Sequence, residues 1–460
     1  WDNKLWTGFT SEKIKRIVHL FIILLLSTVP MLLYGNKLLS PISLDLQTSP
    51  LSFLNTVFYA WQSKQALGTS LNAPGWLFPS GAFFSFLSMV GLPNYVVVRL
   101  WYIALLFFAG SAMYYYAGSI LKNYAAEIQS AGHTSQNEIA KCALIAAIGY
   151  IANPYVVLHL NNGHFLLTYA VLPLQLLILD KGLQSGKLYF AALMGLVSLI
   201  VTTNLPIVVI NYMVILLYVV FYLLSIDKQL IFQKVRFVII SFILISFNLL
   251  WFVLPTALPL LNNDPVLANS ISQETWQMYG MHSSFSETLR LLGIWPLYGG
   301  GFEFSDYYLN NVISIAATYL LPVIALCAAI FMRRSPYIYF LIILLLFSIF
   351  MAVGGYASSP FKGMYVYSYE HVPLFSMFRN GYKFVGVIAF VYVMLISSGL
   401  FILLNHNLIK KQWFSGALYL SIIALFITSA LPLFRGQIFS DSHLAKIPSY
   451  WRDTAKYLDD

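Results

Sequence analysis

The chain has 460 residues, of which 59% are hydrophobic and only 9% are charged. Soluble domains typically carry about 25% charged residues, so the composition excludes an ordinary water-soluble globular protein. The formal net charge of +9 does not indicate nucleic-acid binding, because the basic residues lie in short connections between apolar runs. The composition therefore predicts an all-α polytopic membrane protein.

Apolar runs long enough to cross a bilayer, about 20 residues each, recur along the whole chain. The first run, 17–34, has no small-residue cleavage site behind it, so we interpret it as a span and not as a signal peptide. Two runs are shorter and end at Asn153-Pro154 and at Asn204-Leu205-Pro206. The eleven predicted spans are 16–35, 95–121, 141–154, 164–180, 188–204, 205–225, 235–260, 310–332, 336–354, 382–404 and 412–433.

The distribution of charge predicts the orientation in the plasma membrane. Lys and Arg concentrate in short cytoplasmic loops, and 15 of the 26 basic residues fall in alternate short loops if the N-terminus is cytoplasmic. The C-terminus is then extracytoplasmic. The predicted domains are a transmembrane domain, 1–435, with outer loops 36–94, 261–309 and 355–381, and the start of a truncated extracytoplasmic region, 436–460. Seven acidic residues lie in these outer loops: Asp45, Asp264, Glu274, Glu287, Glu303, Asp306 and Glu370.

The first outer loop contains two apolar segments that are too short to span. Ser49-Pro50 is a typical helix start. Behind it, apolar side chains recur at helical spacing as far as Trp61 and predict an amphipathic helix lying on the membrane. A second apolar piece, 79–90, is expected to lie in or near the interface.

Asp45 is the only acidic residue of this loop. It follows the first span at the depth of the lipid phosphates, where a carboxylate can act as a general base or hold a metal ion. The alternative is a solvated loop aspartate or a cap for the surface helix. Asp45 is the predicted catalytic residue.

Three cations are candidate ligands for a donor phosphate. Arg379 and Lys383 precede a span whose N-terminus faces outward, and helix N-termini attract anions. Four residues apart, they are predicted to share one helix face, with Arg offering bidentate contacts to phosphate. The alternative is snorkelling to lipid headgroups. Arg99 lies within a span, where ionisable groups usually face a cavity, and it is the third candidate.

A weaker set of residues has the chemistry of sugar binding, which needs hydroxyl partners and flat apolar platforms. An ordinary interfacial loop has the same composition, and for His164 a structural role is an equal alternative. The eight histidines are scattered without a metal-binding spacing, so no metal site is predicted and a divalent cation is left open. The weaker candidates are His164, Asp264, Trp276, Glu370 and His371.

Several short blocks occur in the order found in a known family. They are Leu44-Asp45-Leu46, the segment 50–61, Gly75-Trp76-Leu77-Phe78-Pro79-Ser80-Gly81, Gly91-Leu92-Pro93 through Arg99-Leu100-Trp101, Phe378-Arg379-Asn380 with Lys383-Phe384, and Ile447-Pro448-Ser449-Tyr450-Trp451-Arg452. Together they resemble the N-terminal membrane region of the AftD-type arabinofuranosyltransferases of mycobacteria.

That resemblance implies a GT-C membrane glycosyltransferase. Such enzymes use polyprenyl-phosphate sugars outside the membrane, with an essential carboxylate in the first outer loop, the position of Asp45 here. The implied partners are this donor, a cell-envelope glycan or glycolipid acceptor and membrane lipids, with no nucleic acid. Family members continue into β-rich, carbohydrate-binding outer domains, so this chain resembles only their membrane half. Many GT-C enzymes have paired acids in the first loop, and this chain has one.

Two other classes of protein are consistent with the pattern. A transporter or lipid flippase is favoured by the two short, proline-ended runs, 141–154 and 188–206, as broken helices around a central site. It is disfavoured because almost no charged residue lies deep inside a span, where coupled transport usually needs one. A non-catalytic envelope-assembly scaffold is disfavoured only by the clustering of carboxylates in the outer loops.

Overall fold

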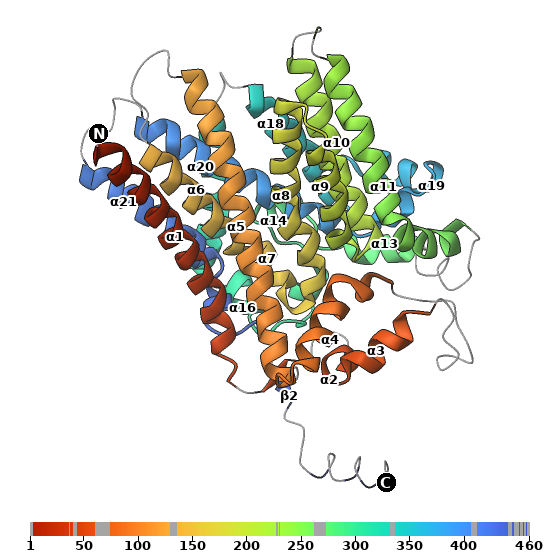
Figure 1. The fold of residues 1–460 in the computed structure, drawn as a ribbon. Helices are drawn as coiled ribbons and strands as arrows, with labels where there is room; N and C mark the ends of the chain where they lie inside the picture. The colour runs from red at the N-terminus through yellow and green to blue at the C-terminus, as the bar shows by residue number, and fades with distance from the viewer. Residues whose placement is uncertain are drawn as a thin grey trace.

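The computed structural model is a bundle of long helices with short helices packed at one end and along one side (Figure 1). It describes residues 3–35, 37–39, 44–59, 74–128, 136–226, 229, 231–261, 273–331, 336–405, 412–439, 444–445, 450, 454 and 457.

Nine helices in the described part of the chain are long and apolar enough to cross a membrane. Each has at least 18 residues, close to the length that the hydrocarbon core requires. The prediction of an all-α polytopic membrane protein is therefore confirmed. The nine are α1 (Asn3–Leu32), α5 (Asn94–Ile128), α6 (Gln136–Ile151) with α7 (Pro154–His159), α8 (Gly163–Ser185), α10 (Leu205–Ser225), α11 (Ile231–Leu261), α17 (Val312–Phe331), α18 (Pro336–Val353) and α20 (Val385–Asn405).

The two remaining predicted spans correspond to shorter apolar helices. They are α9 (Tyr189–Ser198), which continues as a 3₁₀ turn over Leu199–Val201, and α21 (Gln412–Ser429). An apolar helix thus stands at every predicted position, while the count of eleven spans stays a prediction.

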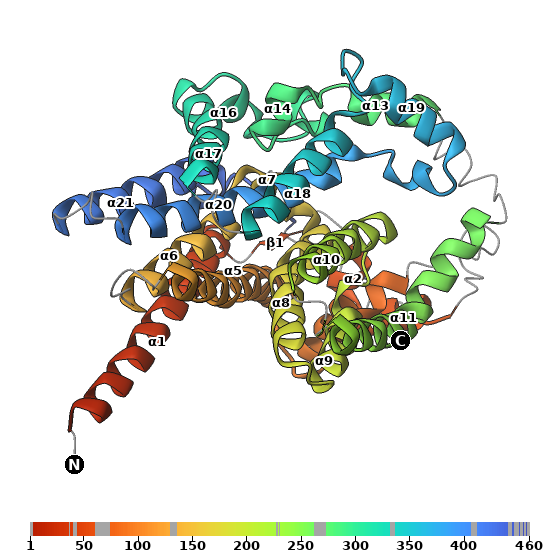
Figure 2. The same cartoon turned by 90° about the horizontal axis from the view of Figure 1, so that it is seen from above.

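Helix α20 forms the centre of the bundle. Every residue from Val385 to Phe401 is buried, and α6, α17 and α18 pack around it. A helix that is apolar on all sides needs such surroundings. By contrast, α1 and α11 lie at the periphery (Figure 2) and expose large apolar side chains such as Phe21 and Phe247. Those side chains suit contact with lipid.

The segment between α1 and α5 folds into short helices beside the lower end of α5 in Figure 1. They are α2 (Leu44–Thr48), α3 (Pro50–Val57) and α4 (Ala82–Met89). Within α3, Pro50 and Val57 are buried while Ser52 and Asn55 are exposed, as expected for an amphipathic helix. Helices stand at both predicted positions with shorter bounds, and Trp61 lies outside the described residues. Their location at the membrane surface stays a prediction.

The remaining short helices form two groups between the long ones. α13 (Gln273–Gly280), α14 (Phe285–Leu289), α15 (Trp295–Tyr298) and α16 (Ser305–Leu309) precede α17, and α19 (Lys362–His371) follows α18. In Figure 2, α16, α14, α13 and α19 lie along one edge of the bundle.

The residues after α21 pack against the residues that follow α1. After α22 (Leu431–Phe434), the Ile438 backbone N–H donates to the Tyr34 hydroxyl at 3.0 Å, and the rings of Tyr34 and Phe439 lie 5.1 Å apart. Strands β1 (Leu38–Leu39) and β2 (Leu444–Ala445) then pair antiparallel. The segment that carries Asp45 is therefore anchored on its N-terminal side.

Candidate active site

Lys383 is held at the entry to α20 by its two neighbours. The 3₁₀ turn Gly381–Phe384 precedes α20, and Tyr382 and Phe384 are both buried, each 1% exposed. Tyr382 stacks on His159 with ring centroids 5.2 Å apart and donates to the Leu291 carbonyl at 3.0 Å. These anchors fix the direction of the half-buried Lys383 side chain between them.

The Lys383 ammonium has two partners from distant parts of the chain. Its Nζ donates to Asn204 Oδ1 at 2.9 Å and lies 5.9 Å from the centroid of the Phe165 ring. Asn204 is the residue before α10, and Phe165 lies in the first turn of α8. An ammonium has three donors, so the hydrogen bond to Asn204 orients Lys383 without exhausting it.

Arg379 lies on the turn before Lys383. It follows the 3₁₀ turn Phe375–Phe378, and its charge acts on both Lys383 and Tyr369. Burial raises the pKa of the Tyr369 phenol, and the nearby Arg379 guanidinium opposes this rise. The prediction that Arg379 and Lys383 share one α-helix face is wrong, because α20 begins only at Val385. Two successive 3₁₀ turns bring the two cations near each other instead.

Asp45 lies on α2 with its side chain exposed. The next residue, Leu46, is buried in the core and fixes the short helix against α5. Asn94, the first residue of α5, donates from its side chain to the Thr48 carbonyl at 3.2 Å. The carboxylate therefore stands on an anchored helix and faces outward.

Contacts through the start of α8 connect the Asp45 helix with Lys383. A cavity of about 20 Å³ separates α2 from α8. Gly163 lines this cavity, and Phe165, two residues later in α8, lies beneath the Lys383 ammonium. A second connection starts at Thr202, two residues before Asn204. The Thr202 hydroxyl donates to the Phe78 carbonyl at 3.0 Å. Asp45 and Lys383 are thus brought to the same end of the bundle. The residues lining the small cavity are Leu46, Gln47, Trp76, Ser80, Phe84, Val98, Trp101, Tyr102 and Gly163.

An apolar groove on the outer side of the bundle leads toward Lys383. Helices α10, α18 and α20 line a cavity of about 290 Å³, and its residue Phe384 is adjacent to Lys383. Along α10 the groove begins at Ile210, six residues or about 9 Å from Asn204. Both partners of the Lys383–Asn204 hydrogen bond therefore stand at the same end of the groove. The lining residues are Ile210, Met213, Val214, Leu216, Leu217, Val220, Ile343, Leu344, Phe347, Ser348, Phe384 and Val387.

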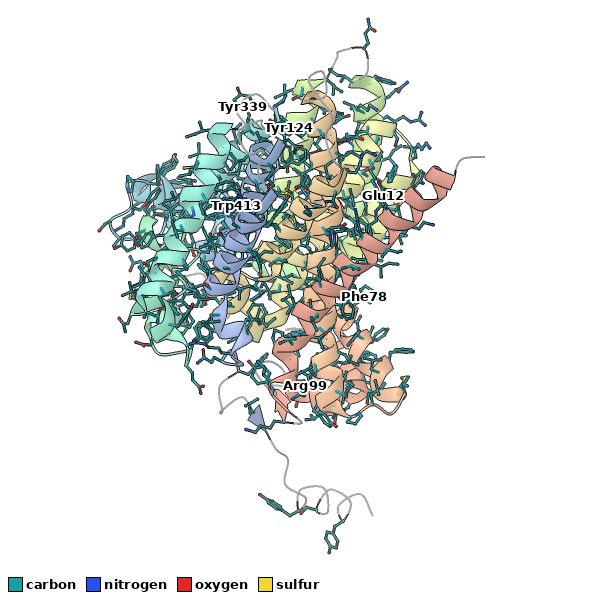
Figure 3. All side chains as sticks on the ribbon, turned by 90° about the vertical axis from the view of Figure 1, so that its left-hand side faces the viewer. Glu12, Phe78, Arg99, Tyr124, Tyr339 and Trp413 are labelled. Atoms are coloured by element: carbon teal, nitrogen blue, oxygen red, sulfur yellow. The ribbon has the colours of Figure 1, made fainter. Side chains whose placement is uncertain are left out.

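The Arg99 guanidinium forms hydrogen bonds to backbone carbonyls. Its guanidinium donates to the carbonyls of Tyr95, Tyr34 and Lys37, the last at 2.8 Å, and the residue is 7% exposed. It thereby ties the end of α1 to the start of α5 (Figure 3). This geometry gives Arg99 a structural role, and we leave it out of the donor site.

Replacing Arg99 by alanine is expected to lower the stability of the protein by about 2–3 kcal/mol, because buried carbonyls lose their donors. Arg99→Lys should restore little of the loss, since a single ammonium lacks the guanidinium fork. Thermal unfolding in nanodiscs measures the effect, with Arg435→Ala at an exposed position as the control. Equal melting temperatures for the Arg99 and Arg435 variants would contradict the assignment.

The weaker sequence candidates have different locations. Trp276 is buried, with its ring 6.2 Å from those of Tyr365 and Tyr369, so it packs and is no open sugar platform. Glu370 and His371 are exposed at the end of α19. Asp264 and the side chain of His164 lie outside the described residues.

Sequence reasoning missed Asn204 and Phe165 as neighbours of Lys383. Asn204-Leu205-Pro206 is a recognisable helix start, but its partner lies 179 residues away. The groove was also missed, because its walls come from helices that are all uniformly apolar.

The break in the helix formed by α6 and α7 is filled by protein atoms. The Asn153 side-chain amide donates to the carbonyls of Gly149 and Tyr150, each at 2.9 Å, and the rings of Tyr150 and Tyr169 stack with centroids 4.0 Å apart. The break thus satisfies its own freed carbonyls. It gives no support to a transporter-like central site there.

Comparison with known proteins decides the family. Residues 31–460 match the family described as alpha-(1->3)-arabinofuranosyltransferase, N-terminal GT-C domain. This chain belongs to that family. The resemblance found in the short blocks is thereby confirmed, and the bundle is the GT-C domain of a multi-pass membrane protein.

Curated relatives and solved structures agree with this assignment. The chain is 44% identical over 64 residues to an alpha-(1->3)-arabinofuranosyltransferase of Mycolicibacterium smegmatis and 42% identical over 64 residues to one of Mycobacterium tuberculosis. Each match covers 14% of this chain, and 4% and 5% of the relatives.

The fold matches cryo-EM structures of arabinofuranosyltransferase AftD from mycobacteria. Two of them have TM-scores of 0.65 and 0.60 at 18% identity, and each match covers 96% of this chain. At this identity the likeness shows the fold alone. The chain spans 28% and 29% of those solved chains, less than a third of their length.

Proposed function

We propose that this GT-C domain transfers a sugar from a polyprenyl-phosphate donor to a cell-envelope glycan or glycolipid acceptor, with inversion at the anomeric carbon. The observation that carries the proposal is the apolar groove lined at one end by Phe384, the residue next to Lys383. In the proposal, an apolar chain lies in this groove and its charged head passes Phe384 to meet Lys383, which is hydrogen-bonded to Asn204 and under the electrostatic influence of Arg379. A long isoprenoid with a phosphate head has that shape and charge.

In the proposed reaction, Asp45 takes the proton from an acceptor hydroxyl. The hydroxyl oxygen attacks the anomeric carbon, and the bond between that carbon and the phosphate oxygen breaks. The electron pair leaves on the polyprenyl phosphate, whose charge Lys383 and Arg379 stabilise in a low-dielectric site. The sequence places one carboxylate, not a pair, in the first loop, so Asp45 is the only base assigned.

The orientation of the protein in the membrane follows from the distribution of its basic residues. The basic loops predict that the N-terminus of α1 is cytoplasmic, which places α2 and Lys383 on the outer side of the plasma membrane. On that side, lipid-linked sugars can serve as glycosyl donors in place of nucleotide-activated sugars. The relatives are named arabinofuranosyltransferases, so arabinofuranose is the first sugar to test.

Transfer is tested directly with the protein in nanodiscs, a radiolabelled polyprenyl-phospho-arabinofuranose and an oligosaccharide acceptor. The proposal expects a labelled acceptor with the inverted anomeric configuration. Movement of the donor between leaflets of proteoliposomes without transfer would support a flippase, and neither activity would support a scaffold.

A divalent cation is the alternative to charge neutralisation by Lys383 and Arg379. With two cations near the donor phosphate, transfer is expected to persist in EDTA within about twofold of the untreated rate. Activity that is lost in EDTA and restored by Mg²⁺, Mn²⁺ or Ca²⁺ would assign the phosphate to a metal ion instead.

A bulky side chain in the groove should discriminate between long and short donors. Leu216 lies on the groove wall twelve residues, or about 18 Å, along α10 from Asn204, beyond the reach of a two-isoprene donor. Leu216→Trp is expected to raise the KM of a long-chain donor about tenfold, the loss of roughly two buried methylenes. The KM of the short donor should not change.

Val323→Trp on α17 is the matched control, because Val323 is 53% exposed and Leu216 is 51% exposed. The groove assignment is contradicted if both variants affect the long donor equally, or if Leu216→Trp affects neither donor.

A further inference from the structure

Another cavity lies at the end of the bundle opposite Asp45. It has a volume of about 370 Å³ between α5, α8, α10, α18 and α20. Tyr124, one of its lining residues, lies at the upper end of α5 in Figure 3, whereas Arg99 lies at the lower end. The cavity includes Ser225 and Pro336, where α10 ends and α18 begins. In the proposed orientation this level corresponds to the cytoplasmic headgroups.

A buried carboxylate lines this cavity. Asp180 is 3% exposed, and its carboxylate accepts hydrogen bonds from the Tyr218 hydroxyl and the Gln184 side-chain amide, each at 2.7 Å. Both donors are neutral. The exposed Lys181, the next residue on α8, acts on the carboxylate electrostatically, but among the described residues Asp180 forms no ion pair. The nearby Lys234 ammonium donates elsewhere, to the Gln184 carbonyl at 3.0 Å. Burying a charge is costly unless an opposite charge accompanies it, so the cavity suits a cationic group.

Two further observations point to a ligand. Ser398 is 1% exposed, lines the same cavity, and its hydroxyl has no hydrogen-bond partner among the described residues. The walls also carry the aromatic rings of Tyr124, Tyr222 and Tyr337. A carboxylate together with aromatic faces is the chemistry that binds an ammonium group.

The surroundings favour a lipid over a free solute. At the same end of α10, Leu224 is 83% exposed, which provides apolar surface beside the mouth of the cavity. We propose that this cavity binds the ammonium headgroup of a phospholipid, phosphatidylethanolamine, with its acyl chains beside Leu224 at the C-terminal end of α10. The ammonium pairs with Asp180, and its hydrogen-bond donors reach the Ser398 hydroxyl. This site is separate from the glycosyl-transfer site.

Native mass spectrometry of the protein released from nanodiscs tests the proposal. In mixed phosphatidylethanolamine and phosphatidylglycerol, the wild type should retain one phosphatidylethanolamine, and Asp180→Asn should lower this retention at least fivefold. Glu138→Gln is the matched control, because it removes a carboxylate near the same end that is paired with Lys141 at 3.0 Å. Its retention should equal that of the wild type.

Ser225→Trp provides a variant that does not disturb the core, since Ser225 is exposed at the mouth of the cavity. It should also lower retention. Equal retention by all variants would overturn the proposal, as would an equal loss in Asp180→Asn and Glu138→Gln. If free ethanolamine at equal concentration displaces the lipid, the cavity is a site for a solute, and the proposal of a lipid site is overturned.

Discussion

Asp45→Asn is expected to reduce transfer by about 10²–10⁴-fold, the usual contribution of a general base. The amide keeps the size and the hydrogen-bonding reach of the carboxylate but does not take the acceptor proton. Because Asp45 is exposed on α2, the change should leave the fold and the melting temperature intact. The loss should appear in kcat, while the Kd for the donor stays the same.

Asp306→Asn is the appropriate control for this experiment. Asp306 is another outer-loop aspartate, on α16, and it accepts a hydrogen bond from the Asn310 side chain. The control should transfer at the wild-type rate. If Asp45→Asn retains more than about a tenth of the activity, below the range for a lost general base, the base is another group.

Lys383→Met is expected to reduce kcat by about 10²–10³-fold, the loss typical when one preorganised donor to a developing oxyanion is removed. Methionine keeps the unbranched stem that lies near Phe165 and removes the ammonium bonded to Asn204. Donor affinity should fall as well, because the phosphate is charged before and after transfer. Rate measurements over a series of donor concentrations separate the two effects.

Lys362→Met at the start of α19 serves as the control, since it removes one cation from the same outer region. Lys383→Arg should recover part of the lost activity by restoring the charge. If Lys383→Met leaves kcat and the donor Kd unchanged, Lys383 does not bind the donor phosphate, and the groove is not shown to lead to a phosphate site.

The fold was largely predictable because membrane spanning imposes a simple length and polarity rule. The apolar runs of the sequence correspond to helices throughout the described chain, including the two short ones, α9 and α21. Which helix lies at the centre was not predictable. α20 and α11 are both apolar along their length, yet α20 is enclosed and α11 faces outward, and only tertiary packing distinguishes them.

The candidate site was predictable only residue by residue. Asp45, Arg379 and Lys383 were found from charge and position, but the hydrogen bond from Lys383 to Asn204 joins residues 179 positions apart. Helical spacing misassigned the geometry of Arg379 and Lys383, because 3₁₀ turns precede α20. Arg99 was read as a cavity residue, since the sequence does not show that three backbone carbonyls surround its guanidinium.

Asp180 was missed for a related reason. It ends the predicted span 164–180, where a carboxylate is expected to meet water and headgroups. The structure extends the helix to Ser185 and encloses the side chain between Tyr218 and Gln184.

A cryo-EM structure of the protein in nanodiscs with a non-hydrolysable polyprenyl-phosphate sugar tests the central claim most directly. The account predicts the donor phosphate within hydrogen-bond distance of Lys383, the isoprenoid between α10 and α18, and the anomeric carbon on the side of the site that faces Asp45. A phosphate bound away from Lys383, or an anomeric carbon farther from Asp45 than an acceptor hydroxyl or one bridging water can span, would contradict it.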